Sequence, residues 1–334
     1  MKILIYIGYQ KKDLSYSDFV EGNHIGGTEI LSLRLVEGLA KCGFDVYLGG
    51  NLESGKHNGV KWLNLQECSK IHFDVAVSAS YLHFIDSIKS TRKYFWMHNT
   101  DYHGWYQGEW VYNDKDLNDD RITGIIALTE WHKNQLLRDY NITKPIHVIG
   151  NAIDRNTFGF EKKKVKNSFI YSSAADRGLY RLLNMWPFVQ EIVPDATLNV
   201  FCPGYSQPSN NIWPNGVTYH GTVDQETLHN WQQKSEYWLH PTDYEETYCI
   251  TALEMQYAKV IPITSDISAL SEVVKGGYLL PKGETDQGFL NIIKEITKSP
   301  ALKDTLRSKG FEFAKQQSWN TRIIDWIQFF KQDA

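Results

Sequence analysis

Two carboxylates, Glu246 and Glu254, stand eight residues apart in the stretch HPTDYEETYCITALEMQYAKVIPITS (240–265). Glu246 precedes a predicted helix start and Glu254 lies inside the helix, which separates the two acids by about 12 Å along its axis. The backbone N–H groups of Tyr248, Cys249 and Ile250 fall between them and are expected to lack helical partners. This order of groups suits a ligand in which hydroxyl groups flank an anion.

A nucleotide sugar has that chemistry. The free N–H groups and the helix dipole favour a diphosphate, while each carboxylate can accept hydrogen bonds from hydroxyls on its own side. The alternative interpretation makes Glu246 a helix-start charge and Glu254 an exposed helix residue. The apolar neighbours of Glu254, which are Leu253 and Met255, favour the first interpretation because they indicate a largely buried segment.

Two further segments place polar residues after predicted strands, where ligands bind in open α/β sheets. EGNHIGGTE holds Gly26 and Gly27 ahead of a helix, and WMHNTDYHGW (96–105) holds His98. The glycine pair could form a turn or an anion site, and His98 could be a structural hydrogen-bonding residue or a catalytic one. The pair matches neither G-x-G-x-x-G nor the P-loop pattern, so an oxidoreductase or a P-loop nucleotide hydrolase loses its main support.

A third segment, YSSAADRGLYRLLNMW (171–186), follows the first strand predicted in the second half of the chain. It presents Ser172, Ser173 and Arg177 just before a helix. An arginine at this place can bind a phosphate through two parallel hydrogen bonds. The alternative is a surface arginine that makes an ordinary contact at the helix start.

Short apolar runs alternate with amphipathic segments along the whole chain. ILIYI (3–7) predicts a strand and TEILSLRLVEGLAKCG (28–43) a helix, and the same alternation recurs in the second half. It predicts parallel sheets covered by helices on both faces. The lysine-rich stretch FGFEKKKVKN (158–167) predicts a solvated hinge. The final segment predicts a helix that buries one face, formed by Trp319, Ile323, Ile327 and Phe330.

Composition limits the classes of function. The 334 residues are 42% hydrophobic and 22% charged, which is typical of a globular protein of two domains. A formal charge of −4 argues against nucleic acid as a partner. The four cysteines, which are Cys42, Cys68, Cys202 and Cys249, lack C-x-x-C spacing and indicate reduced thiols in the cytoplasm. No apolar run predicts a signal peptide or a transmembrane segment, and peripheral attachment to a membrane stays open.

The segment EETYCITALE resembles the E-x7-E motif of retaining glycosyltransferases with the GT-B fold. Within these, the chain is similar to glycosyltransferase family 4 through seven more segments in the same order: GGTE, MHNTD, VIGNAIDRNTF, ADRGL, YHGTV, SALSEVV and SWNTRIIDW. The resemblance implies an α/β fold of two Rossmann-like domains that face each other across a cleft. It implies an acceptor-side domain at 1–158, a nucleotide-sugar-binding domain at 159–318, and a C-terminal helix at 319–334 that crosses back to the first domain.

The resemblance also implies roles for single residues. His98 would lie beside the sugar and the acceptor, Arg177 would stabilise the departing diphosphate, and Glu246 would hold sugar hydroxyls. Glu254 would bind the ribose hydroxyls, and the backbone near Val223 would contact the base. The remaining donor-binding positions are Gly26, Gly27, Ser172, Ser173, Tyr248, Cys249 and Ile250.

Several positions depart from the family pattern. Ser172 and Ser173 stand where the family has its first basic residue, and Cys249, Lys259 and Ala152 stand where glycine is common. Arg177 is therefore expected to be the main cation on the phosphates. None of these changes removes a carboxylate.

The function implied is that of a retaining hexosyltransferase of glycan biosynthesis that needs no metal or cofactor. GDP-mannose is the first expected donor and UDP-glucose or another UDP-sugar the second, with a glycan, glycoconjugate or other hydroxyl compound as acceptor. A homodimer is compatible with this prediction. The alternatives are a nucleotide-sugar epimerase or hydrolase on the same fold, and an inactive nucleotide-sugar binder, which the missing first basic residue favours.

Overall fold

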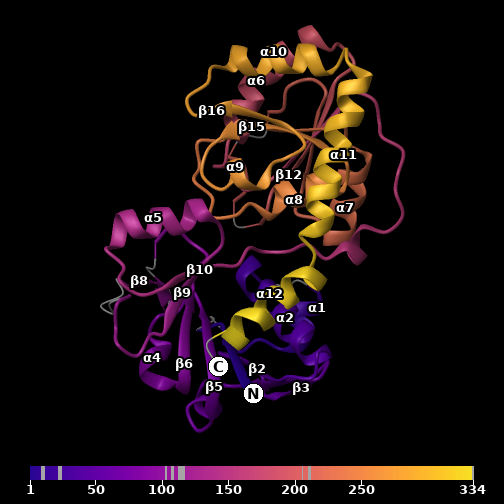
Figure 1. The fold of residues 1–334 in the computed structure, drawn as a ribbon. Coiled ribbons are helices and arrows are strands. Elements are labelled where there is room, and N and C mark those ends of the chain that lie inside the picture. The colour runs from indigo at the N-terminus through magenta and orange to yellow at the C-terminus, as the bar shows by residue number, and fades with distance from the viewer. Residues whose placement is uncertain are drawn as a thin grey trace. The chain divides into compact units, whose positions relative to one another are not determined.

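The chain forms two compact units in the computed structural model (Figure 1). The structure describes residues 1–8, 12–21, 25–101, 104–106, 109–111, 117–204, 206–209 and 212–332. The first unit is Met1–Asn151 together with Trp319–Ala334, and the second is Ala152–Ser318. None of the helices in these described ranges combines the length and the apolar character that a membrane crossing requires.

The first unit is built on an eight-stranded sheet. Its strands are β1 (Lys2–Tyr6), β2 (Asp45–Gly49), β3 (Gly55–His57), β4 (Val60–Leu63), β5 (His72–Ala79), β6 (Lys89–Trp96), β9 (Gly124–Ala127) and β10 (Ile146–Val148). They lie in the order β10-β9-β6-β5-β1-β2-β4-β3, and all neighbours are parallel except β3 and β4. The order reverses between β1 and β5, as in Rossmann-like folds.

Helices and a hairpin complete this unit. The helices are α1 (Tyr16–Glu21), α2 (Gly27–Lys41), α3 (Leu65–Cys68), α4 (Phe84–Ser87), α5 (Glu130–Tyr140) and α12 (Trp319–Gln332), and the hairpin pairs β7 (Gly104–Tyr106) with β8 (Glu109–Val111). β1 buries Ile3, Leu4 and Ile5 completely, because a central parallel strand is covered on both faces.

The C-terminal helix α12 packs on the first unit beside α2 (Figure 1). Trp326 is fully buried and meets Trp96 of β6 edge-on, with ring centroids 5.0 Å apart. Gly38 of α2 lets the two helices approach, since a Cβ there would clash with the side chain of Ile323. Aromatic burial and this close approach therefore hold the end of the chain on the first sheet.

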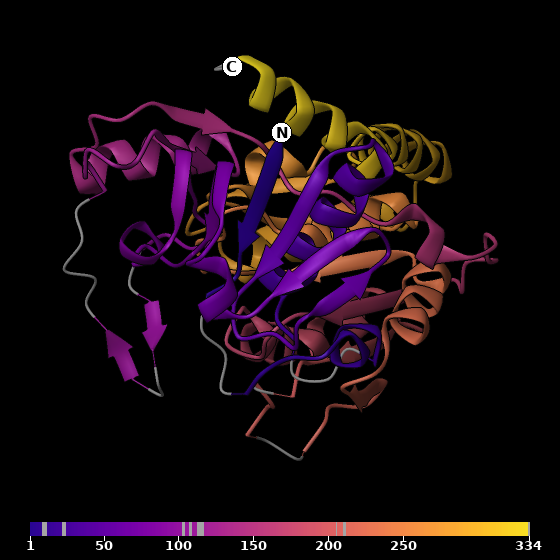
Figure 2. The same cartoon turned by 90° about the horizontal axis from the view of Figure 1, so that it is seen from below.

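The buried face of α12 is turned slightly from the predicted one. Ile323 and Phe330 are buried as predicted, but Trp319 and Ile327 are only half-buried. Trp326 and Phe329 take their place in the core. The start of β1 and the last turn of α12 lie close together (Figure 2), because the Arg92 guanidinium contacts the Met1 sulfur and donates to the Phe330 carbonyl.

The second unit is built on a six-stranded parallel sheet. Its strands are β11 (Ser168–Ser172), β12 (Thr197–Phe201), β13 (Val217–Gly221), β14 (Tyr237–His240), β15 (Ile261–Asp266) and β16 (Tyr278–Pro281). Its helices are η1, a 3-10 helix (Arg155–Phe158), α6 (Leu179–Ile192), α7 (Gln225–Lys234), α8 (Ile250–Tyr257), α9 (Leu270–Val273), α10 (Asp286–Ile296) and α11 (Pro300–Gln316). The strand order β13-β12-β11-β14-β15-β16 reverses between β11 and β14.

A mainly parallel and a fully parallel sheet wound in this way, with α12 on the first, confirm the predicted α/β class of two Rossmann-like domains. The units divide at Asn151 and Ala152, whereas the sequence predicted a boundary after residue 158. The difference arises because η1 packs on α7: the Phe158 ring is buried and stacks on His229 at 4.0 Å. Ile153 also donates its N–H to the Gln317 carbonyl, which ties both ends of the second unit together.

Lys164 corrects the prediction of a solvated hinge. Its amine donates to the Ala258 carbonyl at 2.6 Å and to the Gln232 carbonyl at 3.4 Å. Burial lowers the pKa of this lysine to about 7. One member of the lysine run is thus part of the packing of the second unit.

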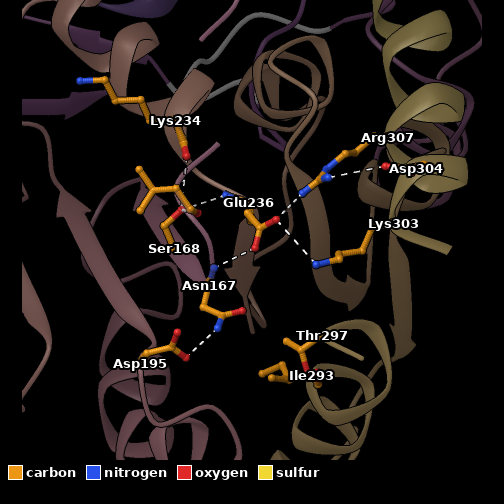
Figure 3. A network of polar contacts seen from close by, with 11 residues as sticks. Asn167, Ser168, Asp195, Lys234, Glu236, Ile293, Thr297, Lys303, Asp304 and Arg307 are labelled. Atoms are coloured by element: carbon orange, nitrogen blue, oxygen red, sulfur yellow. Dashed lines mark hydrogen bonds and ion pairs between the residues drawn. The ribbon is translucent and has the colours of Figure 1, made fainter. Parts of the chain in front are cut away.

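A polar network around Glu236 lies at the amino end of β14 (Figure 3). The buried Glu236 carboxylate accepts from Arg307 at 2.7 Å and from the Asn167 N–H at 2.8 Å, and the Lys303 amine lies 3.7 Å away. Asn167 in turn donates to Asp195. The network joins β14 to α11 at the end of the sheet opposite to the loops that follow its strands.

We expect Glu236→Ala to lower the free energy of unfolding by about 3 kcal/mol, because it leaves two partly buried cations without their carboxylate. Urea unfolding measures this effect. Glu312→Ala, which removes an exposed acid of α11, is the control and should change the same quantity by less than about 0.5 kcal/mol. Equal effects of the two substitutions would contradict a structural role for the network.

Candidate functional site

The loops that follow β11 and β14 meet where the strand order of the second sheet reverses. These two strands are neighbours, and their chain connections lead to opposite sides of the sheet. Ligands bind at such a point in open α/β sheets because it leaves a crevice beyond the strand ends. Arg177 lies in the first of these loops and Glu246 in the second, so the fold brings together two residues that are distant in the sequence.

Arg177 and Glu246 form an ion pair. The Arg177 Nη1 atom donates to Glu246 Oε1 at 3.1 Å, and the guanidinium lies over the ring of Tyr244 at 3.8 Å. The Glu246 side chain is 9% exposed and that of Arg177 is 28% exposed. The pair is therefore partly shielded from water, and it places a guanidinium and a carboxylate side by side at the strand ends.

The backbone of both loops is fixed by close contacts. The Glu246 N–H donates to Ser268 Oγ at 3.0 Å, and the Glu246 carbonyl accepts from the Ala269 N–H at 3.2 Å. Gly178 has φ +102° and lies so near Pro241 that a Cβ would stand 2.7 Å from its carbonyl oxygen. Only glycine fits both the conformation and the contact. This packing sets the position of Arg177 against Glu246.

Helix α8 begins at Ile250, slightly later than the sequence analysis assumed. Cys249 caps it with φ +64°, a left-handed conformation that residues other than glycine rarely adopt. The N–H groups of Cys249 and Ile250 therefore belong to this helix start, and Tyr248, which is buried, precedes the cap. Burial, and to a smaller extent the nearby Glu246 carboxylate, raise the pKa of the Cys249 thiol well above its usual value, so this thiol is neutral.

Two polar side chains lie buried at the ends of the central strands. Ser172 ends β11 and His240 ends β14. Within the described part of the chain, neither the Ser172 hydroxyl nor the two His240 ring nitrogens have a hydrogen-bond partner. Burial lowers the pKa of His240 to about 4, which keeps the ring neutral at pH 7. Ser173, the other predicted serine, is half-buried in the same loop.

Glu254 lies on α8 and contacts α7 rather than Arg177. Gln225 Nε2 donates to Glu254 Oε1 and Gln232 Nε2 donates to Glu254 Oε2, both at 3.2 Å. His229 Nε2 is 3.5 Å from the same Oε1 atom. Val223, predicted to lie near the base, is two residues before Gln225 and directly precedes the α7 cap. The two acids therefore have different partners: a cation for Glu246 and amides for Glu254.

The first unit holds the other predicted residues. Gly26 caps α2 and Gly27 begins it, and a Cβ on Gly27 would meet no atom within 4 Å. Neither glycine has a positive φ, so neither packing nor conformation within the described residues requires Gly27 to be glycine. His98 follows β6, and burial together with the neighbouring His132 lowers the pKa of His98 to about 3.

The loop that carries His98 is held by α5. His132 Nε2 donates to the Asn99 carbonyl at 3.0 Å, while its Nδ1 accepts from the Leu128 N–H. Gln135 donates to the Thr100 carbonyl at 2.8 Å. His103, which lies in the same predicted segment, falls outside the described residues.

Four site residues were missed by the sequence analysis: Tyr244, Gln225, His229 and Gln232. The last three occupy positions i, i+4 and i+7 of α7, a spacing that places polar side chains on one helix face. That spacing could have identified the polar face of α7 from the sequence. No cluster of three or more potential metal ligands occurs among the residues that the structure describes.

Comparisons with known proteins agree with this architecture. Residues 168–299 match the family model described as "Glycosyl transferases group 1". No curated protein sequence is a significant match to the chain. The solved sucrose-phosphate synthase of Thermosynechococcus elongatus is similar over 99% of this chain and 98% of its own, with a TM-score of 0.72 at 14% identity.

Two other solved structures are similar over the full length. HepE of Anabaena, solved in complex with UDP-glucose, has a TM-score of 0.71 at 11% identity and covers 99% of this chain and 100% of its own. A glycosyltransferase of Rickettsia africae has a TM-score of 0.70 at 14% identity and covers 99% and 98%. The chain thus has the fold of GT-B glycosyltransferases, and part of its second unit is similar to group 1 glycosyl transferases.

Proposed function

We propose that the protein is a retaining glycosyltransferase that moves a hexose from a nucleoside diphosphate to a hydroxyl group of a glycan or another acceptor. The observation that carries this proposal is the Arg177–Glu246 pair beside the start of α8, within the segment that matches the glycosyl transferase model. A cation, backbone donors and a carboxylate at one place match the phosphate and hydroxyl groups of a nucleotide sugar.

Breaking the sugar–phosphate bond leaves negative charge on the diphosphate. Arg177 and the N–H groups of Cys249 and Ile250 would stabilise that charge, and donors fixed before the reaction usually contribute the largest catalytic effect. In the free protein Glu246 already holds one end of the guanidinium. In the proposed complex the Arg177 guanidinium donates to the diphosphate, and the Glu246 carboxylate accepts hydrogen bonds from sugar hydroxyls.

The reaction is proposed to proceed by attack from the face that the diphosphate leaves. The acceptor hydroxyl then forms the new glycosidic bond, the sugar–phosphate bond breaks, and the departing phosphate oxygen takes the acceptor's proton. This scheme needs no nucleophile from the enzyme, and we propose that it needs no metal. Burial lowers the pKa of His98 to about 3, which suits a neutral hydrogen-bonding residue beside the sugar rather than a general acid.

The donor is proposed as GDP-mannose first and UDP-glucose second. The resemblance to family 4 favours the mannose donor, whereas the HepE complex with UDP-glucose supports the second choice. The inactive binder is the competing function, and the uncharged Ser172 at the end of β11 is the observation that favours it. Binding without transfer distinguishes this binder from the enzyme.

Arg177→Ala should lower kcat by about 100-fold or more, because it removes the main cation at the leaving group. Arg181→Ala is the matched control, since that arginine lies one helical turn further on, pairs with Asp286 and should leave kcat within about threefold. Turnover of a radiolabelled donor measures both, with thermal melting as the check on folding. An Arg177→Ala enzyme as fast as the control would remove the arginine from the mechanism.

Gly27→Ala tests the contribution of the first unit. The substitution should leave thermal stability unchanged or slightly raised, because alanine fits the open space and favours a helix. It should nevertheless raise KM for the donor about tenfold if a ligand approaches the start of α2 closely. An unchanged KM would exclude that approach.

Calorimetric titration with GDP-mannose, UDP-glucose and their free diphosphates tests the donor class. One nucleotide sugar should bind, and Glu254→Ala should weaken it about tenfold or more by removing the acceptor of the ribose hydroxyls. Transfer measured with a chelator present should equal transfer without it. Absence of binding by every donor would overturn the proposed function, and unaltered affinity in Glu254→Ala would overturn the ribose assignment.

A further inference from the structure

The buried face of α7 is polar. The fully or nearly buried residues of this helix are His229, Gln232 and Gln233, and none of them is apolar. Buried polar groups cost free energy unless they are hydrogen-bonded. These side chains therefore need specific partners, and two of the three lie at Glu254.

The Glu254 carboxylate is held by one amide on each oxygen. Gln225 Nε2 lies 3.2 Å from Oε1, and Gln232 Nε2 lies 3.2 Å from Oε2. Each carboxylate oxygen can accept about two hydrogen bonds. By this capacity each oxygen can accept one further hydrogen bond, and two such bonds match a pair of neighbouring hydroxyl groups.

His229 determines how Gln225 is oriented. The His229 Nδ1 atom lies 3.2 Å from the Thr157 carbonyl, which can only accept, so Nδ1 carries the hydrogen. Gln225 Nε2 stands 2.7 Å from the other ring nitrogen, and because an amide nitrogen can only donate, His229 Nε2 is the acceptor of this hydrogen bond. The Gln225 amide has two hydrogens, and it gives one to His229 and one to Glu254.

The imidazole cannot turn easily. It is 3% exposed and stacks on Phe158 with centroids 4.0 Å apart and planes at 13°. Phe158 meets Tyr257 of α8 edge-on at 4.9 Å. The direction of the Nε2 lone pair, and with it the amide of Gln225, is therefore fixed by packing against η1 and α8.

We propose that His229 is a positioning residue for the nucleotide ribose. Through Gln225 it orients the Glu254 carboxylate so that one acceptor site on each oxygen is presented to the 2′- and 3′-hydroxyls. This inference rests on the proposed function, which places the ribose at Glu254. His229 itself does not touch the nucleotide.

Two substitutions separate this role from simple packing. A glutamine places an oxygen near the position of Nε2 and can accept from Gln225, whereas an asparagine places its amide near Nδ1 and can reach only Thr157. Both remove the ring that stacks on Phe158. His229→Gln should bind UDP or GDP, whichever the natural protein binds, within about threefold, and His229→Asn should bind it about tenfold more weakly.

A double substitution tests the route through Gln225. Gln225→Ala should weaken nucleotide binding about as much as His229→Asn, and the two changes together should weaken it little further, because they break the same link. In turnover assays the loss should appear in KM for the donor, with kcat within about twofold. Calorimetry on the full chain gives the affinities, and thermal melting checks that the variants fold.

The outcomes are distinct. If the natural protein binds nucleotide and Glu254→Ala weakens it, but the glutamine and asparagine variants of His229 bind alike or in the reverse order, the positioning role is wrong and the proposed function stands. Additive losses from Gln225→Ala and His229→Asn would likewise overturn the role. If the natural protein binds neither UDP nor GDP, the proposed function fails and this inference with it.

Discussion

The reversal of strand order between β11 and β14 is the constraint on which the candidate site depends. Because the two strands are adjacent and parallel, the loops after them leave the same edge of the sheet and meet there. Gly178 allows the first loop to rest on the backbone at Pro241, and Ser268 fixes the second. The Arg177–Glu246 pair at 3.1 Å is the consequence. A different strand order in the second sheet would separate Arg177 from Glu246, even if each loop kept all the contacts within itself.

The two acids of the E-x7-E segment have different electrostatic surroundings. Glu246 faces a guanidinium and a neutral thiol, so its charge is balanced within the free protein. Glu254 is held mainly by amide donors from α7, which orient the carboxylate without neutralising it. The arrangement at Glu246 suits a site that binds the negative charge of a phosphate. The arrangement at Glu254 suits recognition of hydroxyl groups, which are neutral donors.

Much of the architecture could be predicted from the sequence because it follows from hydrophobic pattern. Apolar runs such as residues 3–7 and the aromatic stripe of α12 bury surface, and burial dominates the choice of fold. Glu246 and Arg177 could be placed ahead of helix starts, and Glu254 inside a helix, for the same reason. The two units divide at Asn151 and Ala152 rather than after residue 158, because one buried aromatic ring, Phe158, attaches η1 to the second unit.

The polar face of α7 could not be recognised from hydrophobic pattern. Gln225, His229 and Gln232 form hydrogen bonds with one another or with residues of α8 and η1. Such partners are distant in the sequence and are visible only in three dimensions. Tyr244 was missed for a similar reason, since its ring matters only through the guanidinium above it. Lys164 was expected in water because charge in a sequence indicates exposure, yet two backbone carbonyls bind its amine.

A crystal structure of the protein with the nucleotide sugar that it binds tests the central claim most directly. The pyrophosphate should lie against Arg177 and the N–H groups that open α8, with the ribose hydroxyls on Glu254 and the sugar hydroxyls on Glu246. Donor density elsewhere on the second unit, or density that leaves Arg177 without a phosphate contact, would contradict the assignment.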